Sequence, residues 1–386
     1  MFSRRRLLVV TLLLVILAAG GAYLYRAFLS QINFAGSIGG GEQADVTASP
    51  DFSVNVFAAG LSGPRFIAFG PDGALYVAER GAGRIVVLSD ANGDGRADET
   101  RVFAEELDRP HSVAFHNGAW YVGVPSGVVR LADDDGDGVA ESRQVIIDDL
   151  PPGGVHSTRT VAFLPDGRMV VSVGSSCNAC VEEDPRRAAI VAYDDATGAG
   201  ERLFAAGLRN AVGLAIHPET GELWASNNGR DLMGDDTPPE TIYIVRDGAN
   251  YGWPTCHSGD IPDPDMGGPG ACDGVEPPLA EMQAHTAPLG IAFYTGDTFP
   301  ADYRGDLFIA LHGSWNRREP VGYAVWRLPL DGDTPIGPAE PFAAGWLGAS
   351  GAVDGRPAGV AVGPDGALYV SDDRGGFIYR IQYDSP

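Results

Sequence analysis

The chain has 386 residues and a net charge of -24, with 51 acidic residues against 27 arginines. Such an acidic surface repels nucleic acid and anionic lipid headgroups, so both are poor partners. No lysine occurs in the sequence, which excludes Schiff-base catalysis and a P-loop, because each needs a lysine amine. Apolar residues make up 44%, which suffices for a core, and 53 glycines with 28 prolines indicate many turns.

The N-terminus has the pattern of an export signal. Arginines at positions 4–6 precede an apolar run over residues 7–25, which is about long enough to span a bilayer. We expect residues 1–30 to be a signal peptide or a membrane anchor, and the missing cleavage motif favours the anchor. The positive-inside rule then places the remaining chain in the periplasm or outside the cell. Residues 31–50 are predicted to be a flexible linker, and residues 51–386 the folded domain.

The four cysteines form two local pairs. Cys177 and Cys180 make a C-x-x-C motif, and Cys256 and Cys272 flank a loop rich in Pro, Gly and Asp. In an oxidising compartment each pair is expected to form a disulfide. Haem attachment is disfavoured because Val181, and not a histidine, follows the motif. Zinc is disfavoured because no histidine partner lies nearby in the sequence.

One unit recurs six times from residue 64 onward: a polar or proline step, a strand, a P-D-G-type turn and a second strand. The copies cover residues 64–88, 110–131, 156–174, 209–226, 288–313 and 356–383. A repeat of about 40 to 50 residues with several short strands predicts an all-β propeller, here with six blades. A β-sandwich would not need six similar units. The extra strand at residues 52–57 is expected to complete the last blade and close the ring.

The residues just before the innermost strand of each blade are expected to gather around the central channel on one face. We call them the predicted ring: Arg65, His111, His156, Arg209, Asn210, His285 and Arg356. A ring of Arg and His on an acidic protein forms a cationic pocket that attracts an anion.

Three loops are rich in oxygen ligands. The loop at residues 227–236 combines Asn, Gly and Asp and is a plausible seat for a hard cation. The loops at residues 90–98 and 133–141 resemble calcium-binding D-x-[DN]-x-D-G loops. Neither has the spacing to a Glu twelfth ligand, so they are not EF-hands. A structural calcium ion and a solvated acidic turn stay equally open for both.

Several strings resemble a known enzyme group. They are ALYVAERGAGRI, HSTRTVAFLPDG, VGSSCNAC, GLRNAVGLAIHPETGELWASNNGRD, GDDTPPE, ANYGWP, LHGSWNR and GRPAGVAVGPDGALYVSDD. The chain is similar over residues 64–383 to the pyrroloquinoline quinone (PQQ) enzymes of the soluble glucose dehydrogenase and sorbosone dehydrogenase group, with the sorbosone branch closest. Residues 207–254 carry the most specific part of this resemblance.

The resemblance implies a calcium-containing six-bladed propeller that oxidises a sugar, or a related alcohol or aldehyde, by hydride transfer to PQQ. An external acceptor, a quinone or a cytochrome, would take the electrons. His156 would be the general base, which a neutral imidazole suits. Arg209 and Asn210 would contact the quinone oxygens, and Arg356 the PQQ carboxylates.

The same resemblance places the metal in the loop at residues 227–236. The backbone carbonyls of Gly229 and Arg230 would bind Ca²⁺, with Asn228, Asp231, Asp235 and Asp236 as nearby candidates. Within this loop we also expect Asn228 to contact the cofactor. Asp236 is expected to orient the catalytic histidine.

The chain departs from the glucose-oxidising branch in two places. The cofactor lysine of that branch is missing, and His312 or Arg317 is the expected substitute. Ala358 stands where that branch has a second arginine beside Arg356. His285 is expected either to line the substrate mouth or to make a structural hydrogen bond.

Two other functions stay open. A calcium-dependent lactonase or esterase propeller also pairs Ca²⁺ with a histidine, but draws carboxylate and amide ligands from several blades. The predicted ring is richer in arginine than in acids, which favours a cofactor with carboxylates. A non-catalytic binding propeller would need neither His156 nor a cationic ring.

Overall fold

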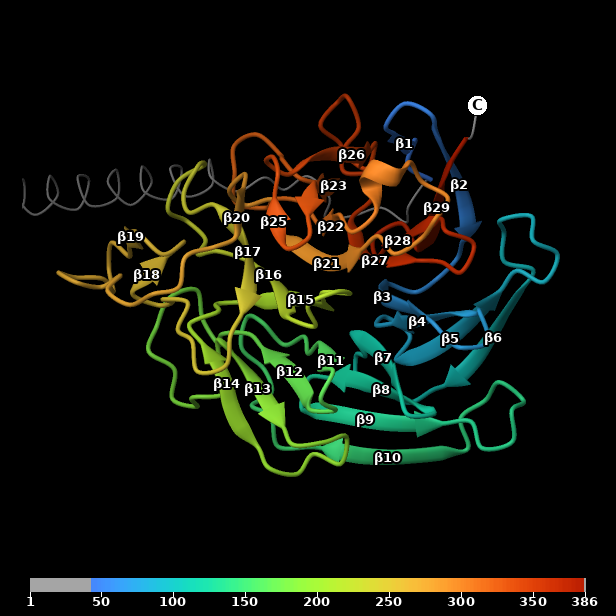
Figure 1. Ribbon diagram of the computed structural model, residues 1–386, viewed down its shortest axis with the longest axis horizontal. Helices are drawn as coiled ribbons and strands as arrows, with labels where there is room; N and C mark the ends of the chain where they lie inside the picture. The colour runs from blue at the N-terminus through green and yellow to red at the C-terminus, as the bar shows by residue number, and fades with distance from the viewer. Residues whose placement is uncertain (1–42, 385–386) are drawn as a thin grey trace, which may run out of the picture.

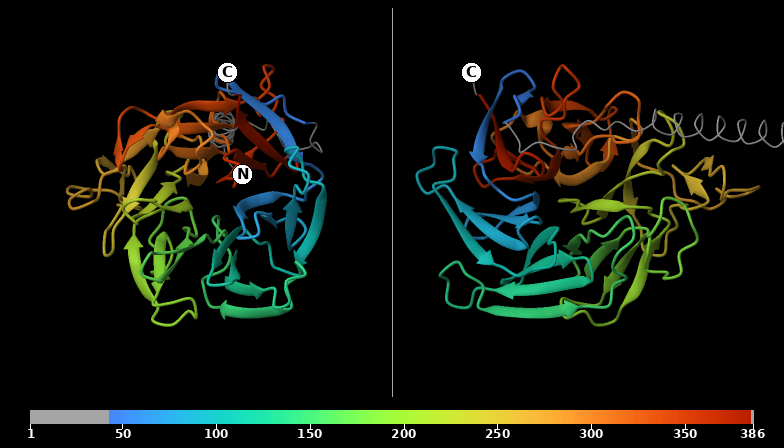
Figure 2. Two further views of the ribbon diagram at one scale, coloured as in Figure 1. Left: turned by 45° about the vertical axis from the view of Figure 1, so that its right-hand side comes forward. Right: turned by 180° about the vertical axis from the view of Figure 1, so that it is seen from behind.

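The computed structural model describes residues 43–384, which form six antiparallel sheets arranged as blades around a centre (Figures 1 and 2). The all-β six-bladed propeller predicted from the repeat is confirmed. Inner strands of neighbouring blades contact one another around the whole ring, so each blade is held by two neighbours. Among residues 43–384, no helix has the length and hydropathy of a membrane span.

The first three blades follow the chain in simple order. Blade 1 is β3 (Pro64–Phe69), β4 (Leu75–Glu79), β5 (Arg84–Ser89) and β6 (Glu99–Ala104). Blade 2 is β7 (Ser112–His116), β8 (Ala119–Val124), β9 (Gly127–Ala132) and β10 (Ser142–Ile147). Blade 3 is β11 (Val161–Phe163), β12 (Met169–Val173), β13 (Ala189–Tyr193) and β14 (Arg202–Ala206).

The last three blades carry the insertions. Blade 4 is β15 (Ala211–Ile216), β16 (Leu223–Asn227), β17 (Glu240–Val245) and β20 (Ala280–Met282). Blade 5 is β21 (Pro288–Phe293), β22 (Leu307–Leu311), β23 (Ala324–Leu328), β26 (Glu340–Ala344) and β1 (Thr47–Ala48). Blade 6 is β27 (Pro357–Val362), β28 (Leu368–Asp372), β29 (Phe377–Tyr383) and β2 (Phe52–Ala58). Small additions are β18 (Cys256–His257) with β19 (Ile261–Pro262), β24 (Leu330–Asp331) with β25 (Thr334–Pro335), and the 3-10 helix η1 (Ala301–Tyr303).

The core lies between blades. The second strand of every blade, such as β4, β8 and β12, is buried along its whole length, because neighbouring blades cover both faces of the sheet. Tyr76 of blade 1 stacks on Trp120 of blade 2 with 4.0 Å between ring centroids. The P-D-G turns join the first two strands, and Gly73 adopts a φ of 79° that a side chain disfavours.

The ring closes where the two ends of the described chain meet. β2 pairs with β29 and becomes the outer strand of blade 6, which confirms the closing role predicted for residues 52–57. β1 pairs with β26 of blade 5, and Ala44 is buried against that blade. Residues 43–50 therefore pack on the propeller, although they fall within the expected linker. The predicted anchor at residues 1–30 lies outside the described residues.

Both predicted disulfides are present. Cys177 and Cys180 lie 6.2 Å apart between Cα atoms, and Cys256 and Cys272 lie 5.3 Å apart. The second disulfide holds a lobe with β18 and β19 that projects from blade 4 (Figure 1).

Replacing Phe52 by alanine should weaken ring closure. Its ring packs on four aromatic rings with centroids 4.7 to 5.4 Å away, those of Phe299, Tyr303, Phe342 and Tyr383. Because Phe52 is half-buried, we expect Phe52→Ala to lower the free energy of unfolding by about 2 to 3 kcal/mol, measured by urea denaturation. Val145→Ala, on an exposed outer strand, should change it by less than about 0.5 kcal/mol. Equal losses in the two variants would contradict this role.

Candidate functional site

Loops from all six blades meet at one end of the propeller. In four blades the first residue of the inner strand pairs with the last residue of the second strand: Pro64 with Glu79, Ala211 with Asn227, Pro288 with Leu311, and Pro357 with Asp372. Loops that enter inner strands therefore lie beside loops that leave second strands. The residues of the predicted ring lie in the loops that enter the inner strands or at the start of these strands. The loops that leave the second strands contribute residues of the site that the sequence did not single out: Ser175, Asn178, Arg187, Asn316 and Asp373.

His156 precedes β11 and is half-buried. Its Nδ1 lies 2.9 Å from the Ser175 hydroxyl oxygen. Because that hydroxyl donates its only proton to the Cys177 carbonyl, at 2.6 Å, it must accept a hydrogen bond from His156. The proton of the neutral imidazole therefore sits on Nδ1, and Nε2 carries the lone pair.

The surroundings of His156 keep it neutral. Burial, together with the positive charges of Arg209 and Arg187, lowers its pKa from 6.5 to about 3, while a hydrogen bond with the Ser175 backbone partly opposes them. At neutral pH the lone pair on Nε2 is therefore unprotonated and open to a hydrogen-bond donor.

Asp236 does not orient His156, contrary to the sequence prediction. Its carboxylate is 86% exposed and accepts a hydrogen bond from Arg317, at 3.1 Å. The loop between β16 and β17 is long and carries Asp236 to the surface. Ser175, and not Asp236, bonds to the His156 ring and orients it. Ser175 comes directly after Gly174, which follows the second strand of blade 3, and that position was the available signal.

Arg209 is 3% exposed and lies at the centre of a polar network. It donates to the Asp231 carboxylate at 2.6 Å, and the other oxygen of Asp231 accepts from Asn316 at 3.0 Å. Protein donors therefore contact both oxygens of this predicted metal residue, and each oxygen keeps a second lone pair. Asn178 donates to and accepts from this network as well.

Asn210 lies beside His156. A Cβ atom added at Gly174 would come within 2.5 Å of the His156 Cβ and 2.6 Å of the Asn210 Oδ1. The two predicted residues therefore converge over a glycine that leaves no space for a side chain. The backbone N–H of Asn210 donates to Asn227, and its carbonyl accepts from Asn228.

The predicted metal loop offers free carbonyl groups. Among residues 43–384, no group donates a hydrogen bond to the carbonyl oxygen of Gly229 or of Arg230. The Gly229 N–H donates to buried Glu240 at 2.7 Å, and burial raises the pKa of that carboxyl to about 7. Asn228 donates its side-chain amide to Pro288 on blade 5 at 2.6 Å, so it serves as a structural tie. Two free carbonyl oxygens in one loop are ligands that Ca²⁺ accepts.

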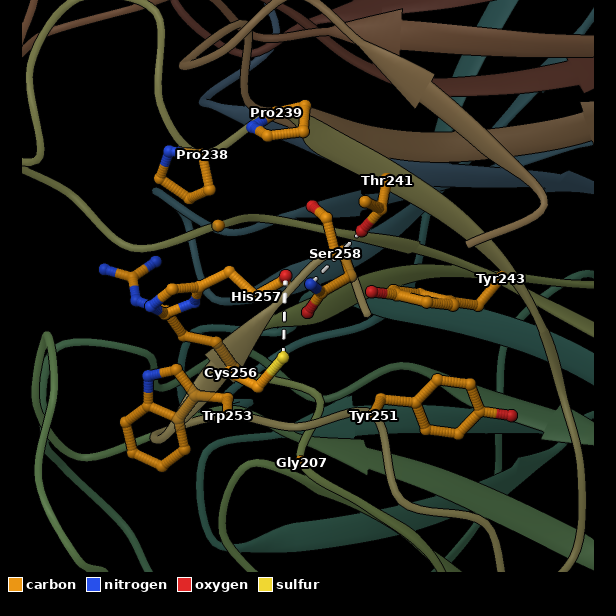
Figure 3. A pocket seen from close by; sticks show the side chains of 13 residues that line it. Gly207, Pro238, Pro239, Thr241, Tyr243, Tyr251, Trp253, Cys256, His257 and Ser258 are labelled. Atoms are coloured by element: carbon orange, nitrogen blue, oxygen red, sulfur yellow. Dashed lines mark hydrogen bonds between the residues drawn. The ribbon is translucent and has the colours of Figure 1, made fainter. Parts of the chain in front are cut away.

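The lobe behind this loop holds it in place. The Arg230 side chain bonds to Asp263 and Asp265, and His257 contacts the same Asp263 at 2.8 Å. A small cavity lies between the loop and the lobe, lined by residues including Arg209, Gly229, Tyr243, Trp253 and His257 (Figure 3). Its volume of about 10 Å³ suits on the order of one water molecule and is too small for an organic cofactor.

Arg356 carries a charge without a carboxylate partner. Its guanidinium donates to the carbonyls of His312 and Gly313 and to the Tyr323 hydroxyl, and it lies 4.9 Å from the centroid of that ring. Among residues 43–384, no acid lies within ion-pair distance of it or of half-buried Arg80. These cations fit an anionic ligand.

Other predicted residues have partners within the protein. His312 contacts Asp373 at 3.0 Å, and the same carboxylate pairs with Arg65 at 2.5 Å. Arg317 bonds to the Asp235 carbonyl and to Asp236. Neither expected substitute for the family lysine therefore has an unpaired charge.

Two histidines of the predicted ring are structural. His285 is buried, donates from Nε2 to the Gly234 carbonyl at 2.8 Å, and accepts at Nδ1 from Asn316 at 3.2 Å. Both ring nitrogens are therefore used, which matches the hydrogen-bonding alternative and not the substrate mouth. His111 is buried and accepts from Arg65 at 3.3 Å.

The acidic loop at residues 133–141 brings four carboxylates within 4.8 Å of one another, those of Asp133, Asp135, Asp137 and Glu141. The first of them accepts hydrogen bonds from Gly136 and Gly138 within the loop. The same backbone pattern stabilises the loop at residues 90–98, where Asp90 accepts from Gly93 and Gly95.

The chain resembles proteins of known and unknown activity. It is 34% identical over 60% of its length to an uncharacterised protein of Borreliella burgdorferi, covering 61% of that protein. It is 27% identical over 86% of its length to a pyrroloquinoline quinone-dependent pyranose dehydrogenase of Coprinopsis cinerea, covering 54% of that enzyme. The chain thus spans about half to three fifths of the length of these curated relatives.

The fold matches solved structures. The holo form of the pyranose dehydrogenase PQQ domain from Coprinopsis cinerea superposes with a TM-score of 0.76, at 24% identity, over 89% of this chain and 98% of that one. The resemblance to PQQ-dependent sugar dehydrogenases stated from the sequence is confirmed by these relatives. Residues 42–378 match the family described as a domain of unknown function, DUF7133, and the chain therefore belongs to that family.

Proposed function

We propose that the chain is an exported PQQ- and calcium-dependent dehydrogenase that oxidises a sugar, or a related alcohol or aldehyde, and passes the electrons to an external quinone or cytochrome. The observation that carries the proposal is His156, neutral and with its lone pair on Nε2, beside the buried guanidinium of Arg209. Two relatives, a PQQ-dependent pyranose dehydrogenase and an aldose sugar dehydrogenase, point the same way.

The residues at the blade ends fit the proposed cofactor. When bound, PQQ supplies a hydride acceptor, and calcium polarises the carbonyl that receives the hydride. The unpaired guanidinium of Arg356 suits a carboxylate of the cofactor. The free carbonyl oxygens of Gly229 and Arg230 suit the calcium ion, whereas protein donors already contact the carboxylate of Asp231.

His156 would take the proton from the substrate hydroxyl. Its Nδ1–H bond to Ser175 holds the ring so that only Nε2 can accept. Arg209 supplies a buried positive charge that favours negative charge developing nearby. Burial excludes water from Arg209, while His156 is half-buried.

The two disulfides support a location outside the cytoplasm, because disulfides persist in oxidising compartments. We place the chain in the periplasm or outside the cell, held at the membrane by residues 1–30. The acidic net charge of -24 disfavours nucleic acid as a partner.

The two alternative functions are less well supported. A lactonase site would use side-chain carboxylates on its calcium, but the carboxylate of Asp231 is engaged by Arg209 and Asn316. A binding propeller would give no reason for the oriented, neutral histidine.

Titration of the purified protein with PQQ and Ca²⁺ tests the cofactor. We expect a saturable change in quinone absorbance that a chelator reverses, and reduction of a redox dye when an aldose is added. Arg356→Met should weaken PQQ binding by roughly 10- to 100-fold, because a charge-assisted hydrogen bond to a carboxylate is lost. No absorbance change in the unmodified protein, and no dye reduction across a sugar panel, would reject the proposal.

The base role predicts a split effect for His156→Asn. We expect kcat to fall by roughly 100- to 10,000-fold while the dissociation constant of PQQ changes by less than about threefold. His116→Asn is the matched control, because His116 stacks on Phe163 at the opposite end of its blade and should leave both constants unchanged. Turnover that survives in His156→Asn would exclude His156 as the base.

The protonation state of His156 can be measured without cofactor. In protein labelled with ¹⁵N-histidine, NMR should show the Nδ1–H tautomer, with no protonation between about pH 8 and pH 5, because burial holds the pKa near 3. Ser175→Ala should allow the other tautomer. An imidazole that titrates near pH 6.5 would contradict the assignment.

The same pKa shift has a consequence for stability. The unfolded chain binds a proton at this residue below about pH 6.5, and the folded chain does not until about pH 3. The histidine therefore lowers the free energy of unfolding as the pH falls through that window. Between about pH 7 and pH 5, the free energy of unfolding measured by urea denaturation should fall less in His156→Asn than in the unmodified protein.

A further inference from the structure

The turn that follows β12, residues 175–180, contacts two parts of the site at once. Its first residue, Ser175, orients His156, and the Cys177–Cys180 disulfide closes it. Between the two cysteines lies Asn178, a half-buried residue that the proposed reaction does not use and that the sequence did not single out.

We infer that Asn178 is a positioning residue that holds Arg209 and the backbone at Asp231 in the arrangement the cofactor needs. This inference rests on the proposed function and deepens it. In this role Asn178 acts through the two residues that it holds.

Asn178 bonds to Arg209 twice. The Arg209 Nε donates to the Asn178 backbone carbonyl at 3.1 Å, and the Arg209 Nη2 donates to its side-chain Oδ1 at 2.9 Å. The Trp253 indole also donates to the Asn178 carbonyl, at 3.2 Å. The planar guanidinium is therefore fixed by two acceptors of one residue, and its charge is balanced by Asp231 at 2.6 Å.

Asn178 also bonds to the backbone of Asp231 in both directions. The Asp231 N–H donates to the Asn178 Oδ1 at 2.8 Å, and the Asn178 Nδ2 donates to the Asp231 carbonyl at 2.9 Å. The first bond fixes the peptide unit that carries the free Arg230 carbonyl, and the second fixes the peptide unit that follows it. Removing the side chain would free that segment and leave the Asp231 N–H unpaired.

The disulfide explains how one short turn makes all these contacts. Only Asn178 and Ala179 lie between the bonded cysteines, so the turn has little freedom to move its asparagine. The Cys177 carbonyl meanwhile accepts the Ser175 hydroxyl. Ser175 makes the contact with His156, and Asn178 makes the contacts with Arg209. Because two different residues of the turn make these contacts, each can be removed by its own mutation.

Asn178→Ala tests the inference, with Asn55→Ala as the matched control. Asn55 lies on the outer strand β2 and donates its amide to Gly95, away from the blade ends that form the site. We expect Asn178→Ala to weaken PQQ binding in Ca²⁺ by roughly 10- to 100-fold, as for other residues that orient a ligand-binding group. With saturating PQQ, kcat should fall by less than roughly 100-fold, the smallest loss expected of His156→Asn, because Arg209 keeps its bond to Asp231 and Ser175 still orients His156.

A second measurement needs no cofactor. Hydrogen exchange of residues 228–236 in the protein without PQQ should be faster in Asn178→Ala than in the unmodified protein and Asn55→Ala, because the Asp231 amide loses its acceptor. Asn178→Ser, whose side chain is too short to reach Arg209, replaces the alanine variant if that variant does not fold.

The outcomes separate the two proposals. Weaker PQQ binding with faster exchange supports the positioning role. Unchanged exchange, or unchanged PQQ binding in a folded variant, overturns it. If the unmodified protein binds no PQQ, the proposed function fails, and exchange alone then decides whether Asn178 holds the Asp231 segment.

Discussion

Pairing between β2 and β29 is the constraint on which the molecule depends. A blade alone exposes two apolar faces, and each is covered only when both neighbours are present. The strand β2 completes the last blade with residues that come before the first, so the circle has no open edge at that point. Because the circle is closed, the six inner strands converge, and the loops at one end are brought within hydrogen-bonding distance of each other.

The charge balance at the converging loops differs from that of the whole chain. The protein carries a net charge of -24, yet Arg80, Arg159, Arg187 and Arg356 have no carboxylate within ion-pair distance among residues 43–384. Arg159 and Arg187 donate to backbone carbonyls such as that of Pro151, which solvates the charges without neutralising them. Such uncompensated positive charge favours an anionic ligand, and that of Arg187 adds to the burial that keeps His156 neutral.

The sequence predicted the features that repeat or that are local. The six copies of the strand–turn–strand unit gave the number of blades, and the position before each inner strand led to His156 and Arg209. Cysteine spacing gave both disulfides. Contacts between the loops could not be predicted from the sequence, because Ser175, Asn178 and Asp373 follow second strands, where the repeat has no fixed residue type. The prediction for Asp236 failed because the conformation of a long loop is set by tertiary contacts, here with Arg317.

The closing strand also shapes how the chain folds. Partners such as Val54 and Ile381 are separated by more than three hundred residues, so their hydrogen bonds form only after nearly the whole chain has been made. Contacts this distant in sequence slow folding, because the entropy of closing the loop is lost before the contact forms. Until then β2 has an unpaired edge that can pair with another chain, which makes a chaperone that shields it valuable during synthesis.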